Sequence, residues 1–418
     1  MEIATHPILV NQLQHPLSDV LQQALESHRY ALTLDQDNPD TLFNTAQVLT
    51  AIAELYAKDP SRSDHEASQL LAEALELQDR CLAVQELRLE DYIQQQNEAT
   101  AQINSNNPEP QTSESVSEKS DEDAGPSSTR IEDQWFSIVE PVTKDTLIET
   151  ILAELGTLTT LCSILCSAPF TPTANLAWIE EFSSKLIKVK LPALLDDAET
   201  ERIQEVALAR ANFLSSLLEA GYRSGSIDPT AYKRERDEAF QLPELDLGRS
   251  FPALMANASS LIAFNSALAD GDPSHAESLA AQRWNALSAA IANMVAASKI
   301  SGPVPEDIAE THFVRGNCSL LQHQLSLPPT PYQPAVINGA QLLKNADVFY
   351  RNASKLYQIG EQKAVSQFRA SISQALQTGE NVISAAASND QGQGSHWAKV
   401  QFDDMVDDGL ISPAGVVV

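Results

Sequence analysis

Apolar residues recur along most of this chain at the three- and four-residue spacing of one face of an α-helix. Residues 24–56 show the pattern well, because two apolar helical stretches flank the polar run DQDNPD. The best strand candidate, LIKVKL at 186–191, fits a helical pattern equally well, so the sequence predicts an all-α fold. The expected helices cover residues 17–34, 40–57, 64–94, 144–167, 174–194, 197–223, 229–240, 249–269, 273–299, 305–325, 336–358, 362–378 and 397–410.

Residues that favour helix starts precede many of these stretches. In DQDNPD, we expect Asn38 and Pro39 to end one helix and Asp40 to cap the next, because an Asp side chain can accept from the first free backbone N–H groups. Similar signals are Asp64, Asp272 with Pro273, and Pro305.

The segment 95–131 differs in composition from the rest. It holds no aromatic residue and is rich in Ser, Asn, Gln, Pro and acids, so it offers too little apolar area to offset the entropy cost of ordering. We expect it to be a disordered acidic linker. The predicted organisation is N-terminal helices over 1–94, the linker over 95–131, a C-terminal helical block over 132–390, and a terminal helix and tail over 391–418. Within the linker, Asp121, Glu122 and Asp123 follow Ser120, which makes Ser120 a candidate phosphorylation site.

Small residues recur at fixed points of the first helices. Ala24 and Ala31 precede the DQDNPD turn, Ala46 follows it, and Ala67 and Ala74 repeat the spacing of the first two. Small side chains at such points allow two helices to approach closely. The pattern resembles the tetratricopeptide repeat, a unit of two antiparallel helices with small residues at their crossing.

A fainter echo of the same repeat occurs late in the chain. Gly316 suits the small position of a first helix, and Ala346, Tyr350 and Ala353 suit the second helix. The resemblance is clearest over residues 17–80 and fainter over 305–358.

The sequence also departs from the family pattern. Leu42 stands where the family has an aromatic residue, and Gln36 and Gln78 stand at the positions of its turn proline. The resemblance implies an α-solenoid of stacked helix pairs interrupted by the linker. An unrelated, irregular helical bundle is the alternative fold.

The formal net charge is −30, and most of the excess lies in the first 200 residues. Such a charge repels nucleic acids and anionic membranes and attracts a basic protein segment. The most apolar stretch, 147–167, is interrupted by Glu149 and Glu154, so we expect no membrane span. The first residues lack the pattern of a secretory signal. Four scattered cysteines fit reduced core thiols, so we expect an intracellular protein in the cytoplasm, the nucleus or both.

Motifs for catalysis are missing from the sequence. We find no phosphate-binding loop, dinucleotide turn or zinc-type cysteine pair, and we expect no cofactor, no metal and no enzymatic activity. His312, Cys318 and His323 share one helical face but have no acidic partner in the pattern. The most basic patch, KRERDEAF at 233–240, contains its own acids and is typical of a solvated helix face.

These observations favour a protein-binding adaptor. Phe43, Asn44 and Gln47 on the inner face of the 40–57 helix, with the linker acids 121–123, are the candidate partner-binding residues. The most concrete hypothesis is a dedicated acidic chaperone, or escort, for a basic client such as a ribosomal protein. Two alternatives stay open: a structural subunit of a larger complex, and an enzyme with an unrecognised site. The oligomeric state is open as well.

Overall fold

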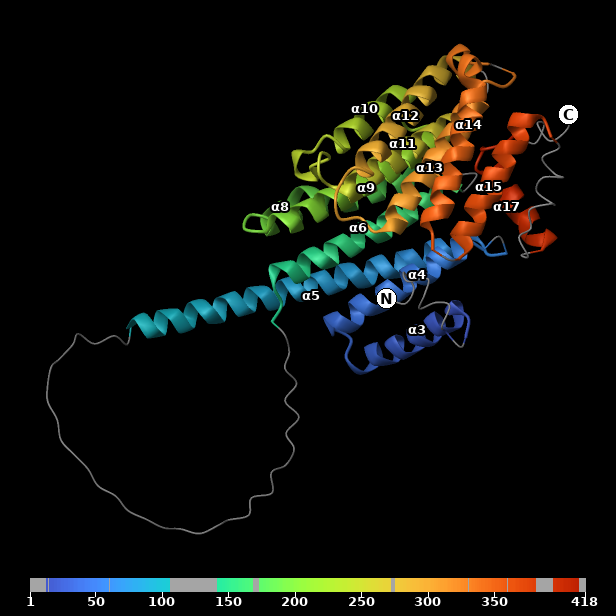
Figure 1. Ribbon diagram of the computed structural model, residues 1–418. Coiled ribbons are helices and arrows are strands. Elements are labelled where there is room, and N and C mark those ends of the chain that lie inside the picture. Colours follow the sequence, from blue (N-terminus) through green and yellow to red (C-terminus); the bar gives the residue numbers. More distant parts are fainter. Residues whose placement is uncertain are drawn as a thin grey trace, which may run out of the picture. The chain divides into compact units, whose positions relative to one another are not determined.

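All regular elements that the computed structural model describes are helical (Figure 1). The described residues are 13, 15–59, 61–105, 141–167, 173–271, 275–329, 331–358, 360–380 and 394–412. The helices are α3 (Leu17–Leu34), α4 (Pro39–Ala57), α5 (Asp64–Ser105), α6 (Lys144–Ser167), α7 (Thr173–Lys185), α8 (Leu191–Leu194), α9 (Thr200–Arg223), α10 (Pro229–Ala239), α11 (Phe251–Ala269), α12 (Ala276–Ala297), α13 (Pro305–Gln324), α14 (Gln333–Leu356), α15 (Glu361–Thr378) and α17 (Ser395–Asp407). A π-helical turn, η1 (Leu186–Lys190), joins α7 to α8, and a 3₁₀ turn, η2 (Pro243–Leu245), follows α10. The chain divides into two compact units: residues 1–52 with 72–154, and residues 53–71 with 155–418.

Helix α5 continues to Ser105, past residue 95, where we expected a disordered linker to begin. The expectation was wrong for residues 95–105, because the Gln, Glu and Ala residues there are good helix formers and no Gly or Pro interrupts them. For the same reason Gln78, which the family pattern would place at a turn, lies inside α5. The remaining linker positions, including Ser120 and the acids 121–123, fall outside the described residues.

The polar run DQDNPD forms the turn between α3 and α4, although its cap differs from our expectation. Asn38, not Asp40, caps α4, because the Asn38 Oδ1 atom accepts a hydrogen bond from the Thr41 N–H at 3.1 Å. Pro39 occupies the first helical position, where its missing N–H costs nothing.

The stretch LIKVKL contains a π-helical turn. The Leu191 N–H donates to the carbonyl of Leu186, five residues back, instead of the usual four. Pro192 follows at once and has no N–H to offer to Lys188. The wider turn thus accommodates a proline within a continuous helical run.

Polar contacts tie α5 to the α3–α4 region in the first unit. Arg29 of α3 pairs with Glu73 at 2.7 Å, and Arg80 pairs with Asp37 at 2.8 Å. The Cys81 thiol donates to the carbonyl of Pro39. These contacts place α5 beside both α3 and the turn that follows it.

In the second unit, consecutive helices from α11 to α15 each pack against the next, and Figure 1 shows α11 to α14 side by side. Helix α9 packs against both α10 and α11. The main apolar cluster includes Tyr232, Phe264, Met294, Tyr350 and Phe368. Helix α17 closes this cluster at one end, because Met405 is fully buried in it and the Trp397 ring contacts the edge of Phe368.

Helices α13 and α14 approach each other closely at Gly316. A Cβ atom built on Gly316 would lie 2.6 Å from Cε1 of Tyr350. The Tyr350 hydroxyl donates to Oδ1 of Asn317 at 2.8 Å, and Arg369 of α15 donates to the same atom at 2.9 Å. Arg369 also reaches Asp408, just beyond α17, at 3.3 Å. Asn317 and Arg369 therefore join α13, α14 and α15 to the end of α17.

One helical segment within the described ranges, Lys144–Cys166 of α6, is long and apolar enough to cross a membrane by length and composition alone. Most of its apolar window, 61%, is buried inside the protein.

Candidate functional site

The largest of the described cavities is a groove between α7 and η1 on one side and α9 and α10 on the other, with a volume of about 830 Å³. We call it the α7–α10 groove; all of its lining residues lie in the second unit. Its volume falls in the range that binding sites for small molecules or for side chains of a partner occupy.

Apolar side chains form most of the groove's floor. Leu214, Leu217 and Leu218 project from one face of α9, because positions three and four apart share a helix face. Leu176 of α7 and Ile187 of the π turn face them and are largely buried. Leu217 lines the groove, is half-buried, and is not a member of the apolar clusters that contain Leu218 and Leu214.

Charged side chains surround this floor. Glu180 and Lys188 contribute from the α7 side, and Arg234, Glu235 and Glu238 from α10. Arg234 pairs with its neighbour Glu235 at 3.0 Å, an exposed contact of little energetic weight. The rim therefore presents both signs of charge around an apolar centre.

Arg210 of α9 also lines the groove. Its Nε atom is buried and has no hydrogen-bond partner among the residues that the structure describes. A buried donor without an acceptor costs free energy, so an acceptor from a bound partner would be favourable here.

Helix α10 is fixed to α11 by a buried arginine. The Arg236 side chain is 4% exposed and donates to Ser260 Oγ at 3.0 Å and to the Asn257 side chain. Burial lowers the pKa of Arg236, and Asp237 opposes that effect. The prediction that KRERDEAF is a solvated face was therefore wrong for Arg236, while Arg234, Glu235 and Glu238 of the same run line the groove.

The start of α10 is also well defined. Asp228 caps it, and its side chain accepts from the N–H groups of Ala231 and Thr230, which lowers the pKa of this carboxyl. The cap and Arg236 together position the charged side chains on the groove's rim.

A smaller polar cavity of about 420 Å³ lies beside Ser163, Cys166, Glu219, Arg223 and Asp270. Arg223 donates to Glu219 at 2.9 Å and to Asp270 at 2.8 Å, so both carboxylates already have a cationic partner. Burial raises the pKa of the Cys166 thiol to about 12, with a smaller contribution from Glu219. A thiol with this pKa is protonated at neutral pH and is a poor nucleophile.

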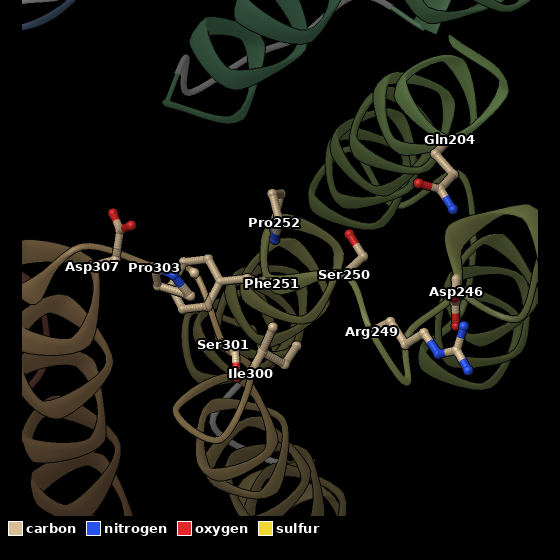
Figure 2. A pocket seen from close by; sticks show the side chains of 11 residues that line it. Gln204, Asp246, Arg249, Ser250, Phe251, Pro252, Ile300, Ser301, Pro303 and Asp307 are labelled. Atoms are coloured by element: carbon tan, nitrogen blue, oxygen red, sulfur yellow. The ribbon is translucent and has the colours of Figure 1, made fainter. Parts of the chain in front are cut away.

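A third cavity, of about 400 Å³, opens where α11 and α13 begin (Figure 2). Gln204, Asp246 and Arg249 lie on one side of it, and Pro303 and Asp307 lie on the other. The polar groups at the helix starts already serve as caps: Ser250 Oγ accepts from the Ala253 N–H, and Asp307 accepts from the Val304 N–H. We find no pair of catalytic groups at hydrogen-bond distance across this cavity.

The histidines that share a face of α13 do not form a metal site. Within the described ranges, no group of three His, Cys, Asp or Glu residues could hold a metal ion. His312 stacks on Phe349, and burial, then the nearby Arg315, lowers its pKa. Burial also lowers the pKa of His323. Both rings therefore favour the neutral form.

The sequence-predicted residues are distributed over both units. On α4, Asn44 is exposed and Phe43 and Gln47 are half-buried. The structure brings none of them to the α7–α10 groove. Their helix face is accessible, but no described cavity includes it.

The small residues singled out for helix crossings are mostly buried. Ala46, Ala67, Ala74, Ala346 and Ala353 are fully buried, and Gly316 is buried against Tyr350. Ala24 and Ala31 of α3 are half-buried.

Sequence reasoning missed the groove, because leucines at helical spacing look the same on a groove floor and in a core. The signal that could have found it is the combination of Pro192 after LIKVK with the mixed charges of 233–240. No protein-family model, no curated protein and no solved structure matches the chain.

Proposed function

We propose that this chain is a tetratricopeptide-like adaptor without enzymatic activity, which binds a segment of a basic partner protein in the α7–α10 groove. Its most concrete form is an escort that shields a lysine-rich client, such as a ribosomal protein, until that client is assembled. The observation that carries the proposal is the groove itself. It has a volume of about 830 Å³, a floor that is rich in leucine, and charged side chains around that floor. Amphipathic helices bind in grooves of this composition by placing their apolar face on the floor.

The repeat-like packing supports the architectural part of the proposal. Successive helices from α11 to α15 pack in chain order, as helix pairs in a solenoid do. The α13–α14 crossing has a glycine, Gly316, against the Tyr350 ring, with Ala346 and Ala353 buried on the same helix as the ring.

We infer a basic partner from the net charge of the whole chain, not from the charges on the groove's rim. Glu180, Glu235 and Glu238 line the groove together with Lys188, Arg210 and Arg234, so the rim is balanced. The net charge of −30 nevertheless favours encounter with a cationic protein at low salt.

The decisive experiment compares two tagged variants in the native cell. Leu217→Asp places a charge on the groove floor, and Leu34→Asp is the control, because Leu34 is 73% exposed on α3. Affinity purification with mass spectrometry should recover a basic partner with the wild type and with the control, but not with Leu217→Asp. Circular dichroism should show that both variants are folded.

Salt distinguishes the escort from a structural subunit. The affinity of the purified partner should fall steeply between about 0.05 and 0.5 M NaCl, because screening weakens attraction between unlike charges. A flat titration would contradict the escort and would instead favour a subunit held by apolar contacts.

A further inference from the structure

The core-facing side of α5 extends beyond the helices that cover it. Ala67, Leu71, Ala74 and Leu82 lie on this side and are fully buried. At three- and four-residue spacing the same side continues through Leu89 to Tyr92 and Ile93. We call Leu89, Tyr92 and Ile93 the α5 stripe.

The α5 stripe is apolar but accessible. Tyr92 is 42% exposed and Ile93 is 48% exposed, and every α5 position from 90 to 101 is exposed. Within the first unit, none of the described residues covers this part of the face. A helix side that is buried along one half and uncovered along the other is a surface where a further element can pack.

Carboxylates border the α5 stripe on the side of Ile93. Helical spacing places Glu86 and Glu90 beside Ile93, and Asp91 and Glu98 lie on the neighbouring turns. Arg88 is the one basic residue in the 86–105 segment, and its guanidinium already donates to the carbonyl of Asp37 at 3.4 Å. The segment is therefore apolar along one line and acidic along the border next to Ile93.

We propose that the α5 stripe binds an amphipathic helix of a partner protein that carries Lys and Arg beside its apolar face. Such a helix would place its apolar residues on Tyr92 and Ile93 and its basic residues beside Glu86 and Glu90. The stripe shares no residue with the α7–α10 groove, so each can be tested independently of the other.

The acidic border of the α5 stripe favours a basic helix over two other possible occupants, a second copy of the chain and residues 131–140. A second copy of the chain would bring acidic segments together, and like charges repel. The apolar segment IEDQWFSIVE at 131–140 of the same chain carries three carboxylates and no base, so it meets the same repulsion. A basic helix is the occupant that both the apolar line and its acidic border favour.

The test uses the full chain and a fluorescein-labelled 15-residue peptide of Leu and Lys. The Leu residues are spaced three and four positions apart, so that they share one face of a helix. Fluorescence anisotropy should show binding of this peptide and none of its Leu–Glu counterpart. Tyr92→Ser with Ile93→Ser should weaken binding by about tenfold or more, since central apolar contacts carry most of the energy of such interfaces. Glu90→Gln with Asp91→Asn should weaken it less and reduce its salt dependence. Because the substituted positions are exposed, we expect these variants to stay folded, and circular dichroism checks this.

The matched control lies on the same helix. Glu76 and Asp79 are exposed carboxylates two turns or more before the stripe, and Glu76→Gln with Asp79→Asn makes the same change of charge. Binding should be unaffected by this control; an equal loss would show general attraction to an acidic protein and overturn the proposal.

The other two occupants predict different results. If residues 131–140 occupied the stripe, Trp135→Ser with Phe136→Ser would raise the affinity for the peptide. If a second copy occupied it, sedimentation would show a dimer that Tyr92→Ser with Ile93→Ser dissociates. Either result would overturn the proposal.

Discussion

At the scale of single residues, the crossing of α13 and α14 shows how little room the fold leaves. Gly316 has no side chain, and the Tyr350 ring fills the space where a Cβ would be. The ring hydroxyl is satisfied by Asn317, so a large polar side chain can be fully buried there. The small residue and the large one are complementary parts of a single contact.

Gly316→Ala should therefore destabilise the protein by about 1–3 kcal/mol, because the added methyl group must displace the ring or the helix. Urea unfolding followed by circular dichroism measures the change. The control is Gly156→Ala in α6, where a Cβ would meet no atom within 4 Å. That variant should gain about 0.5–1 kcal/mol from helix propensity. Equal stability of Gly316→Ala and the wild type would mean that α13 and α14 can separate freely.

The buried thiols predict a dependence of stability on pH. Burial raises the pKa of Cys81 from 9.0 to about 11 and those of Cys162 and Cys318 to about 12. In the unfolded chain these thiols ionise near pH 9, whereas in the folded protein they stay protonated. Their contribution to stability is therefore complete below pH 9 and is lost as the pH rises toward 11–12.

Urea unfolding between pH 8 and pH 11, under reducing conditions, checks this prediction. The free energy of unfolding should fall over this range, and it should fall less steeply for Cys162→Ala with Cys318→Ala. An identical slope for that variant would assign the effect to the remaining groups whose pKa values burial raises, namely Cys81, Cys166 and the buried tyrosines.

Sequence reasoning could identify small residues but not their partners. The spacing of Ala46, Ala67, Ala74 and Gly316 singled them out, and all four are buried. The hydrogen bonds that join Tyr350, Asn317 and Arg369 could not be predicted, because they depend on how three consecutive helices pack and not on a local sequence pattern.

At the scale of elements, most helix bounds could be predicted closely because their signals are local. Leu17–Leu34, Lys144–Ser167 and Pro305–Gln324 start and end within a residue of the expected positions. The end of α5 could not, because polar composition suggested disorder while helix propensity favoured continuation. The groove depends on how α7 packs against α9, which no local pattern encodes.

Arg236 should be the residue that holds α10 in place. Arg236→Met removes its hydrogen bonds to Ser260 and Asn257 and should cost about 2–4 kcal/mol. Arg234→Met is the control, since the Arg234 side chain is 62% exposed, and it should change stability by less than about 0.5 kcal/mol. Hydrogen exchange should show faster exchange in α10 for the first variant alone. Slow exchange in both would show that apolar packing suffices to hold the helix.

At the scale of the whole molecule, the net charge of −30 opposes compaction, because many carboxylates repel one another. The described ion pairs are mostly exposed and contribute little. The cohesion comes from the long apolar cluster of the second unit.

Added salt should therefore raise the melting temperature, since screening reduces the repulsion within the folded chain. Differential scanning fluorimetry between about 0.01 and 0.3 M NaCl measures this effect. Sucrose is the comparison for effects unrelated to charge. The affinity for a basic partner should fall with added salt, whereas the melting temperature should rise, so the two effects can be distinguished. A melting temperature that falls with NaCl would mean that the ion pairs, rather than repulsion, dominate.

The position of α17 has a consequence for biosynthesis. Met405, Leu410 and Ile411 belong to the same buried cluster as Tyr232 and Phe264. During translation, the helices from α10 to α15 leave the ribosome before these last contributors to their core have been made. The nascent second unit therefore exposes part of its apolar interior until residue 411 has emerged from the exit tunnel, so its final closure follows the emergence of α17.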